Sequence, residues 1–318
     1  MRSKNPDTHV IPTDTIYMTI DKDAVRRSGM MHPGDSIPDR MVISLQGKQA
    51  LYKGDLMMLE MIANCNWTRP LYVAITVGGE NFMNLGDNFV QEGLANRITP
   101  FTTTRGNNYD AAKSYDVMMN KFKWGNLSRP GLYLDETTMR MCYTHRREMA
   151  HLAIELLNKH EDAKALKVLQ KSEKEIPYYN VPISLQGGSA EMARAYAVLG
   201  KKAKAMEIFN ALWKNSSQYV AYYLGLNGKF FDMSQFNCKF HIQYLGSILQ
   251  EVDSIDRTWA NTHAKQLEAS PVHSRHGAAA SESKNRLHRS LPSGEGNNFQ
   301  KGKNRPSSAA LPAVSAPA

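Results

Sequence analysis

The sequence predicts an α/β domain, a small mixed sheet with helices, followed by an all-α region of helical hairpins and a disordered C-terminal tail. Three observations support this order. Short β-branched segments alternate with helical patterns in the first part, helical periodicity then runs almost unbroken, and large apolar residues become rare at the end. We therefore expect an α/β domain at 1–135, a helical domain at 136–264 and a basic low-complexity tail at 265–318.

The first elements are two short segments, 15–20 and 41–45, that are rich in β-branched residues and bounded by polar residues, Pro or Gly. This pattern is typical of strands. Between them, Asp21 is positioned to cap a short helix that runs to Arg27. Apolar residues at helical spacing then predict a helix from Asp55 to Asn64, with Asp55 as its cap.

The rest of the α/β domain has weaker patterns. In residues 71–77, the side chains that would point to either face of a strand are apolar or small. This pattern predicts a strand covered on both faces. Residues 96–104 fit another strand, interrupted by Pro100. Residues 115–124 have one apolar helical face and end at Gly125, so we expect a helix there.

One ladder of small and bulky residues occurs twice in the helical domain. Its spacing is that of the tetratricopeptide (TPR) unit, a helix-turn-helix of 34 residues. Small residues at positions 8 and 20 of that unit let two antiparallel helices cross closely. The first copy contains Met149, Leu152, Ala153, Leu156, Ala165, Leu169 and Pro177, and the second contains Met192, Ala193, Tyr196, Ala205, Phe209 and Leu212.

The two copies are 40 residues apart, so about six extra residues lie in the segment 178–188. An aromatic-rich segment after Tyr219 is expected to form a capping helix pair that ends near Ala264. Repeats of this kind bind partners and carry out no chemistry of their own.

Composition argues against several classes of function. Charge-free stretches reach only about 10 to 14 residues, fewer than the roughly 20 that cross a bilayer, and no apolar segment suited to a secretory signal follows the polar first residues. Cys65, Cys142 and Cys238 are too far apart for a paired metal motif, so we expect free thiols. The tail carries +4 of the net charge of +9, and the remaining excess is diffuse, so we expect no nucleic-acid partner.

Motifs for catalysis are absent. Gly47-Lys48 is followed by Gln49, which excludes a phosphate loop. His145 and His151 are six residues apart and so lie on different faces of a helix, unlike a zinc-binding pair. We expect no catalytic residue, no cofactor and no metal site.

The inner helices of the repeats give the clearest binding hypothesis. The positions that a TPR unit turns to its concave face include Arg147, Ile154 and Asn158 in the first copy and Arg194 in the second. The two arginines could bind a carboxylate or an extended peptide. Alternatively, this face packs on the α/β domain. A weaker hypothesis is a sugar platform at Trp67 and Trp124, with packing in the core as the alternative.

Four blocks of sequence resemble a known family. They are G-D-L-M-M-L-E-M-I-A-N-C-N-W-T-R-P-L-Y-V-A-I-T-V-G at 54–78, N-F-V-Q-E-G-L-A at 88–95, N-K-F-K-W-G-N at 120–126 and Y-L-D-E at 133–136. These blocks resemble the soluble C-terminal region of bacterial protein O-mannosyltransferase-like glycosyltransferases, which are multi-spanning membrane proteins. The resemblance covers about residues 11–225 and includes the TPR-like part.

The resemblance implies that catalysis in such proteins belongs to membrane helices that this sequence lacks, so no catalytic residue carries over. It implies a bacterial, non-catalytic portion on the periplasmic face of the inner membrane that positions an acceptor or partner protein. Its other partner would be the membrane-embedded catalytic half, in the same chain or a separate one. The alternative is a stand-alone TPR-type scaffold for protein–protein interaction, and a third hypothesis is a small enzyme that uses the loop at Gly78.

Overall fold

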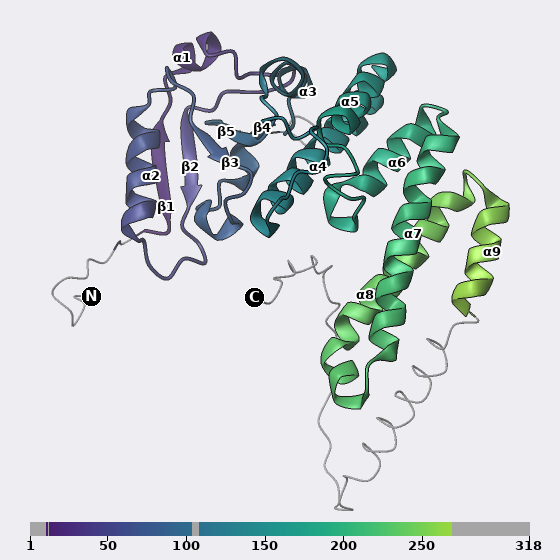
Figure 1. The fold of residues 1–318 in the computed structure, drawn as a ribbon. Coiled ribbons are helices and arrows are strands. Elements are labelled where there is room, and N and C mark those ends of the chain that lie inside the picture. The colour runs from purple at the N-terminus through teal and green to yellow at the C-terminus, as the bar shows by residue number, and fades with distance from the viewer. Residues whose placement is uncertain (1–10, 12, 104–107, 269–318) are drawn as a thin grey trace, which may run out of the picture. The chain divides into compact units, whose positions relative to one another are not determined.

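The computed structural model describes residues 11, 13–103 and 108–268, and an α/β part is followed by an all-helical part, as predicted (Figure 1). Most of the tail predicted to be disordered, 265–318, lies outside the described residues. The α/β and helical parts belong to one compact unit that ends at Ala264. No described helix is both long enough and apolar enough to cross a membrane.

The first sheet is an antiparallel pair formed by β1 (Thr15–Thr19) and β2 (Arg40–Ser44). Between the strands, α1 (Lys22–Arg27) is capped by Asp21, as predicted, and the Asp21 carboxylate accepts hydrogen bonds from the backbone N of Asp23 (3.0 Å) and Ala24 (2.9 Å). Residues of the two strands alternate between the core and the surface.

The helix α2 (Lys53–Asn64) begins two residues before the predicted start, because Asp55 is not its N-cap. Asp55 lies in the first turn, where its carboxylate accepts a hydrogen bond from the backbone N of Tyr52 (2.9 Å) and pairs with Lys48 (2.7 Å). Tyr52 is the N-cap, so Asp55 closes a capping box instead of starting the helix.

The second sheet has three antiparallel strands in the order β3–β5–β4. They are β3 (Tyr72–Ala74), β4 (Phe89–Glu92) and β5 (Ala95–Ile98). The strand predicted at 71–77 is wrong in length and in burial. β3 lies at the sheet edge, Tyr72 is exposed, and the chain turns where Val77 N bonds to Ala74 O (3.0 Å).

The last helix of the α/β part also differs from the prediction at 115–124. Asp110 caps α3 (Ala111–Asp116), which continues as a π-helical segment, Val117–Lys121. The segment ends at Phe122, whose backbone is extended, before Gly125 is reached.

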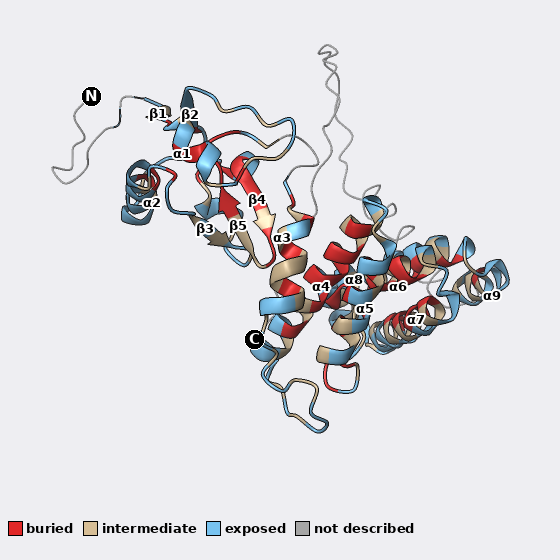
Figure 2. Cartoon of the chain, turned by 90° about the horizontal axis from the view of Figure 1, so that it is seen from above, coloured by how far each residue is buried: buried red, intermediate tan, exposed pale blue. Residues whose placement is uncertain are grey.

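Among the described residues, the second part contains the α-helices α4 (Glu136–Asn158), α5 (Asp162–Glu175), α6 (Ser189–Val198), α7 (Lys202–Gly225), α8 (Gly228–Asp253) and α9 (Arg257–Glu268). α4 packs against α5 and α6, α6 packs against α7, and α7 packs against α8. Figure 2 shows buried residues along β4, β5, α4 and α6. The aromatic segment expected in a capping pair lies on α7 and α8, which pack against each other, and a further helix, α9, extends four residues past Ala264.

The hairpins α4–α5 and α6–α7 share one turn, shifted by 40 residues. Glu161 N donates to Leu156 O (2.9 Å), and Lys201 N donates to Tyr196 O (2.8 Å). The preceding residue has a positive φ in both turns, 59° at His160 and 73° at Gly200. The small residues of the predicted ladder are fully buried where the helices cross: Ala153, Ala165, Ala193 and Ala205.

The segment between the hairpins is held on α4 by Arg146. This side chain is completely buried, and its guanidinium donates to the carbonyls of Ile176 (2.9 Å), Val181 (2.5 Å) and Pro182 (2.9 Å). Gly188 adopts φ +67°, and a Cβ added there would lie 2.5 Å from the Arg147 Cα. The extra residues therefore form a fixed link between the two hairpins.

Candidate functional site

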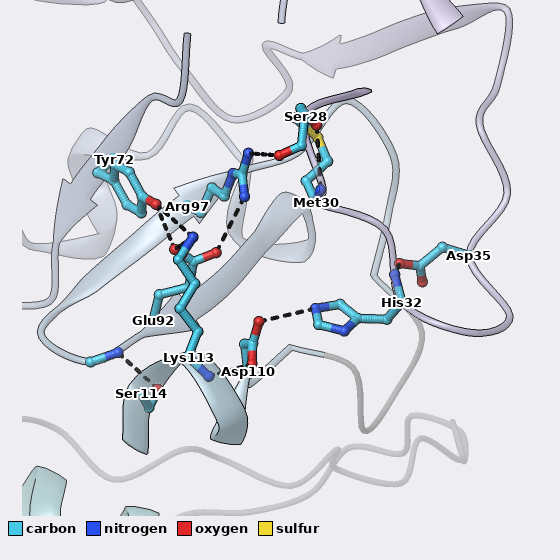
Figure 3. A network of polar contacts seen from close by, with 11 residues as sticks. Ser28, Met30, His32, Asp35, Tyr72, Glu92, Arg97, Asp110, Lys113 and Ser114 are labelled. Carbon is cyan, nitrogen blue, oxygen red and sulfur yellow. Dashed lines mark hydrogen bonds and ion pairs between the residues drawn. The ribbon is translucent and has the colours of Figure 1, made fainter. Parts of the chain in front are cut away.

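Four polar side chains from separate elements converge in the α/β part (Figure 3). Tyr72 on β3 lies directly opposite Arg97 on the central strand β5. Val90 on β4 lies opposite Arg97 on the other side, so Glu92, two residues further along β4, shares that face of the sheet. Lys113 reaches the same place from α3.

Glu92 is the centre of this group, which we call the Glu92 network (Tyr72, Glu92, Arg97 and Lys113). Its Oε2 accepts a hydrogen bond from the Tyr72 hydroxyl (2.5 Å) and lies 2.6 Å from the Lys113 Nζ. Its Oε1 lies 3.5 Å from Arg97 Nη1. Arg97 Nη2 also donates to the carbonyl of Ser28 at the end of α1 (3.2 Å), so one carboxylate ties three strands and two helices together.

The surroundings of the network favour a protonated Tyr72 hydroxyl and a charged Lys113 ammonium. Burial raises the pKa of the Tyr72 hydroxyl, and the hydrogen bond to Glu92 raises it further, so the phenol remains a donor. Burial opposes the charge on Lys113, but the hydrogen bonds to Glu92 and Tyr72 outweigh it and raise the pKa of the ammonium. Buried charges of this kind are stable only when they are paired.

A second polar group lies beside the network. Asp110 faces His32 at 3.9 Å, and the Asp110 carboxylate also accepts the backbone N–H of Lys113 (2.9 Å). Asp35 accepts the backbone N–H of His32 (2.7 Å). These acids therefore stabilise a helix start and a loop.

The chemistry available here is that of a structural anchor. General acid–base catalysis needs a carboxyl group with free access to a substrate, whereas both oxygens of Glu92 already have donors and its side chain is buried. Within 13–103 and 108–268, no group of three or more His, Cys, Asp or Glu side chains is arranged to hold a metal ion.

Gln91 connects the sheet to the first hairpin. Its amide donates to Glu148 on α4 (2.7 Å), and the Tyr109 ring packs against His151 on the same helix at 4.6 Å between centroids. Part of the α4 surface thus packs on the α/β part through Glu148 and His151, which are not among the predicted groove residues.

The predicted groove residues lie on the neighbouring helices α4 and α6. Arg147 is exposed and pairs with Glu148 (3.3 Å), and Asn158 is exposed at the end of α4. Ile154 is half-buried against the core. Arg194 is half-buried and pairs with Glu191 (2.8 Å) and with Glu251 on α8 (3.5 Å). Each arginine therefore faces solvent while it already binds a carboxylate.

The two tryptophans of the sugar-platform hypothesis lie in different environments. Trp67 is 5% exposed in the core of the α/β part, a position that favours the packing alternative. Trp124 is half-buried and packs near Phe122 (5.9 Å) and His145 (6.0 Å). Its indole Nε1 has no hydrogen-bond partner within the described part of the chain.

The Glu92 network is not predicted by the sequence patterns. Tyr72 and Glu92 both lie within the blocks that carry the family resemblance, 54–78 and 88–95. No local signal points to Glu92, because the four residues of β4 are too few to show which of them face inward.

Comparison with known families finds a match in the first part of the chain. Residues 1–119 match the family model of TMEM260-associated domain 2, a range that holds both sheets, α1, α2 and α3 and ends before α4. No curated protein and no solved structure matches the chain.

Proposed function

We propose that this chain is the non-catalytic portion of a membrane glycosyltransferase-like protein and that it positions an acceptor or partner protein on the periplasmic face. The observation that carries the proposal is the match of residues 1–119 to TMEM260-associated domain 2. Two of the four blocks that resemble O-mannosyltransferase-like proteins, 54–78 and 88–95, lie inside that range.

The helical part supplies the binding surface in this proposal. Its two alike hairpins fit the TPR class, whose inner helices bind extended peptides. Arg147 and Arg194 come from the adjacent helices α4 and α6 and remain partly accessible. A carboxylate of the acceptor would replace Glu148 or Glu191 as the partner of these guanidinium groups.

Absence of catalysis is tested by incubating the purified chain with a membrane-derived, lipid-linked sugar donor and a pool of envelope proteins. We expect no transfer by the chain alone, and transfer when the membrane-embedded catalytic part is supplied. Turnover by the chain alone would contradict the assignment.

A stand-alone TPR-type scaffold is the second candidate. One observation favours it: the matched range ends at residue 119, and α4 begins only at Glu136, so the helical part lies wholly outside the match. Under this alternative, removal of the chain leaves sugar transfer in cells unchanged.

A further inference from the structure

The far ends of α7 and α8 form an exposed apolar hairpin, which we call the α7–α8 tip (residues 216–240). Figure 1 shows this hairpin extending beyond α6. Six of its large apolar side chains are between 37% and 75% exposed, which is unusual for so short a segment. They are Tyr219, Tyr222, Phe230, Met233, Phe236 and Phe240.

The apolar side chains of α8 form one continuous stripe. Phe230, Met233, Phe236 and Phe240 are three or four residues apart, the spacing that brings side chains together on a helix surface. Tyr219 of α7 extends the stripe, because its ring stacks on His241 at 4.6 Å and Phe240 lies 5.7 Å from the same ring.

The charges beside the stripe are few and ordered. Residues 215–240 contain only Lys229, Asp232 and Lys239 as charged side chains. Asp232 and Lys239 are seven residues apart, or about two helical turns, so they lie on the same flank of α8. Gln235 donates to Asp232 (3.1 Å), and neither Asp232 nor Lys239 has an ion-pair partner within the described residues.

We propose that the stripe is the interface of a homodimer in which two copies of α8 pack antiparallel across a twofold axis near Gln235. A twofold interface must be complementary to itself. About this axis Phe230 of one copy lies opposite Phe240 of the other, and Met233 lies opposite Phe236. The apolar pattern of α8 meets that requirement.

The positions of Asp232 and Lys239 are compatible with the same twofold axis. In an antiparallel pair related by a twofold axis, the same flank of each helix adjoins its equivalent. Asp232 of each copy then faces Lys239 of the other, so two ion pairs border the apolar contact. One axis thus brings together the aromatic residues and pairs Asp232 with Lys239.

A lipid surface is a poorer occupant of the stripe. Helices that lie on membranes carry Lys and Arg along the polar border of their apolar face, which attracts anionic headgroups. Here Asp232 lies on that border, and the stripe has no basic cluster. A second copy of the chain satisfies this acid, whereas an anionic membrane would repel it.

The test is the molar mass of the full chain by sedimentation velocity over a wide concentration range. We expect a dimer for the wild type and a monomer for Phe236→Glu. Because Phe236 is exposed, its replacement leaves the helical circular dichroism unchanged. Tyr133→Glu, which changes an aromatic residue that is still more exposed and lies outside the stripe, remains dimeric.

A charge-reversal cycle distinguishes this interface from nonspecific apolar association. Asp232→Lys and Lys239→Asp each weaken the dimer about tenfold through two lost ion pairs and new repulsion, and the double variant restores it. A wild type that is monomeric throughout, a dimer that survives Phe236→Glu, or a double variant no better than the singles overturns the proposal. So does a monomer that binds vesicles containing anionic phospholipid through Phe236.

Discussion

Buried arginines in the two parts of the molecule are held in different ways. Arg97 in the α/β part shares the carboxylate of Glu92 with Lys113, whereas Arg146 in the helical part has three backbone carbonyls and no acidic hydrogen-bond partner. The rings of Tyr143 and Tyr178 lie 6.0 and 5.0 Å from the Arg146 guanidinium. Burial lowers the pKa of Arg146, while the partners of Lys113 raise the pKa of that ammonium.

The difference shows two ways in which a fold can accommodate a buried guanidinium group. A short three-stranded sheet joined to two helices is stabilised by charges that come from distant parts of the chain. The link between the helical hairpins is instead stabilised by one cation that satisfies carbonyls its own loop leaves unpaired.

Replacing Arg146 breaks the helical arrangement most severely. Arg146→Leu leaves three carbonyls without this donor, and two of them, those of Ile176 and Val181, are buried. We therefore expect the free energy of unfolding to fall by about 3–5 kcal/mol in urea denaturation. Arg140→Leu, at an exposed position of the same helix, changes it by less than about 0.5 kcal/mol. Equal effects of the two substitutions would contradict the anchoring role of Arg146.

Neutralising Glu92 breaks the α/β arrangement. Glu92→Gln leaves Arg97 and Lys113 near each other without a countercharge, and we expect a loss of about 3 kcal/mol in unfolding free energy. Tyr72→Phe removes only one hydrogen bond from the same carboxylate and should cost about 1 kcal/mol. Chemical denaturation of both variants measures the two losses in unfolding free energy. A larger loss in Tyr72→Phe than in Glu92→Gln would contradict the central role of Glu92.

Gly188 tests whether the link between the hairpins must lie closely on α4. Gly188→Ala meets both a positive φ and the backbone of Arg147, so we expect destabilisation of about 2 kcal/mol. Gly200→Ala is the matched control, because its φ is also positive but nothing lies within 4 Å of the new Cβ. It should cost about 1 kcal/mol. Thermal unfolding of the two variants separates conformational strain from the close contact.

Acidification gives the smallest effect. His241 is buried against Tyr219, its Nδ1 has no hydrogen-bond partner within the described residues, and burial lowers its pKa. The neighbouring rings of Tyr219, Tyr223 and Phe240 supply no countercharge. The folded state therefore favours the neutral imidazole, and this contribution to stability is present above the unfolded pKa of about 6.5 and is lost as the pH falls.

The stability of the wild type should thus decline more steeply below about pH 6.5 than that of His241→Phe. Circular dichroism across a pH series measures both slopes. Parallel slopes would exclude His241 as the source of the decline.

The sequence allowed prediction where local spacing determines structure. The Asp21 cap and the ladder that includes Ala153 and Ala193 follow from neighbours a few residues apart. In the Glu92 network, Tyr72 is 20 positions from Glu92 and 41 from Lys113, and no local pattern encodes such pairs. β4 was also missed, because a four-residue strand has too few alternating positions to produce a signal.

The predicted groove residues could be located from the sequence, but their partners could not. Repeat spacing indicated Arg147, Ile154, Asn158 and Arg194, and the structure places them on the adjacent helices α4 and α6. Their acidic partners could not be predicted, because Glu251 comes from α8, far along the sequence from Arg194.

The proposed function is tested most directly by acceptor glycosylation in cells whose chain carries Arg147→Glu and Arg194→Glu together. Mass spectrometry of envelope glycoproteins reports the modification, and Arg257→Glu is the matched control because that side chain is 79% exposed on another helix. We predict that the double variant accumulates to the normal level but loses acceptor modification, while the control retains it. Normal modification in the double variant, under conditions where removal of the chain abolishes it, would contradict acceptor positioning by this face.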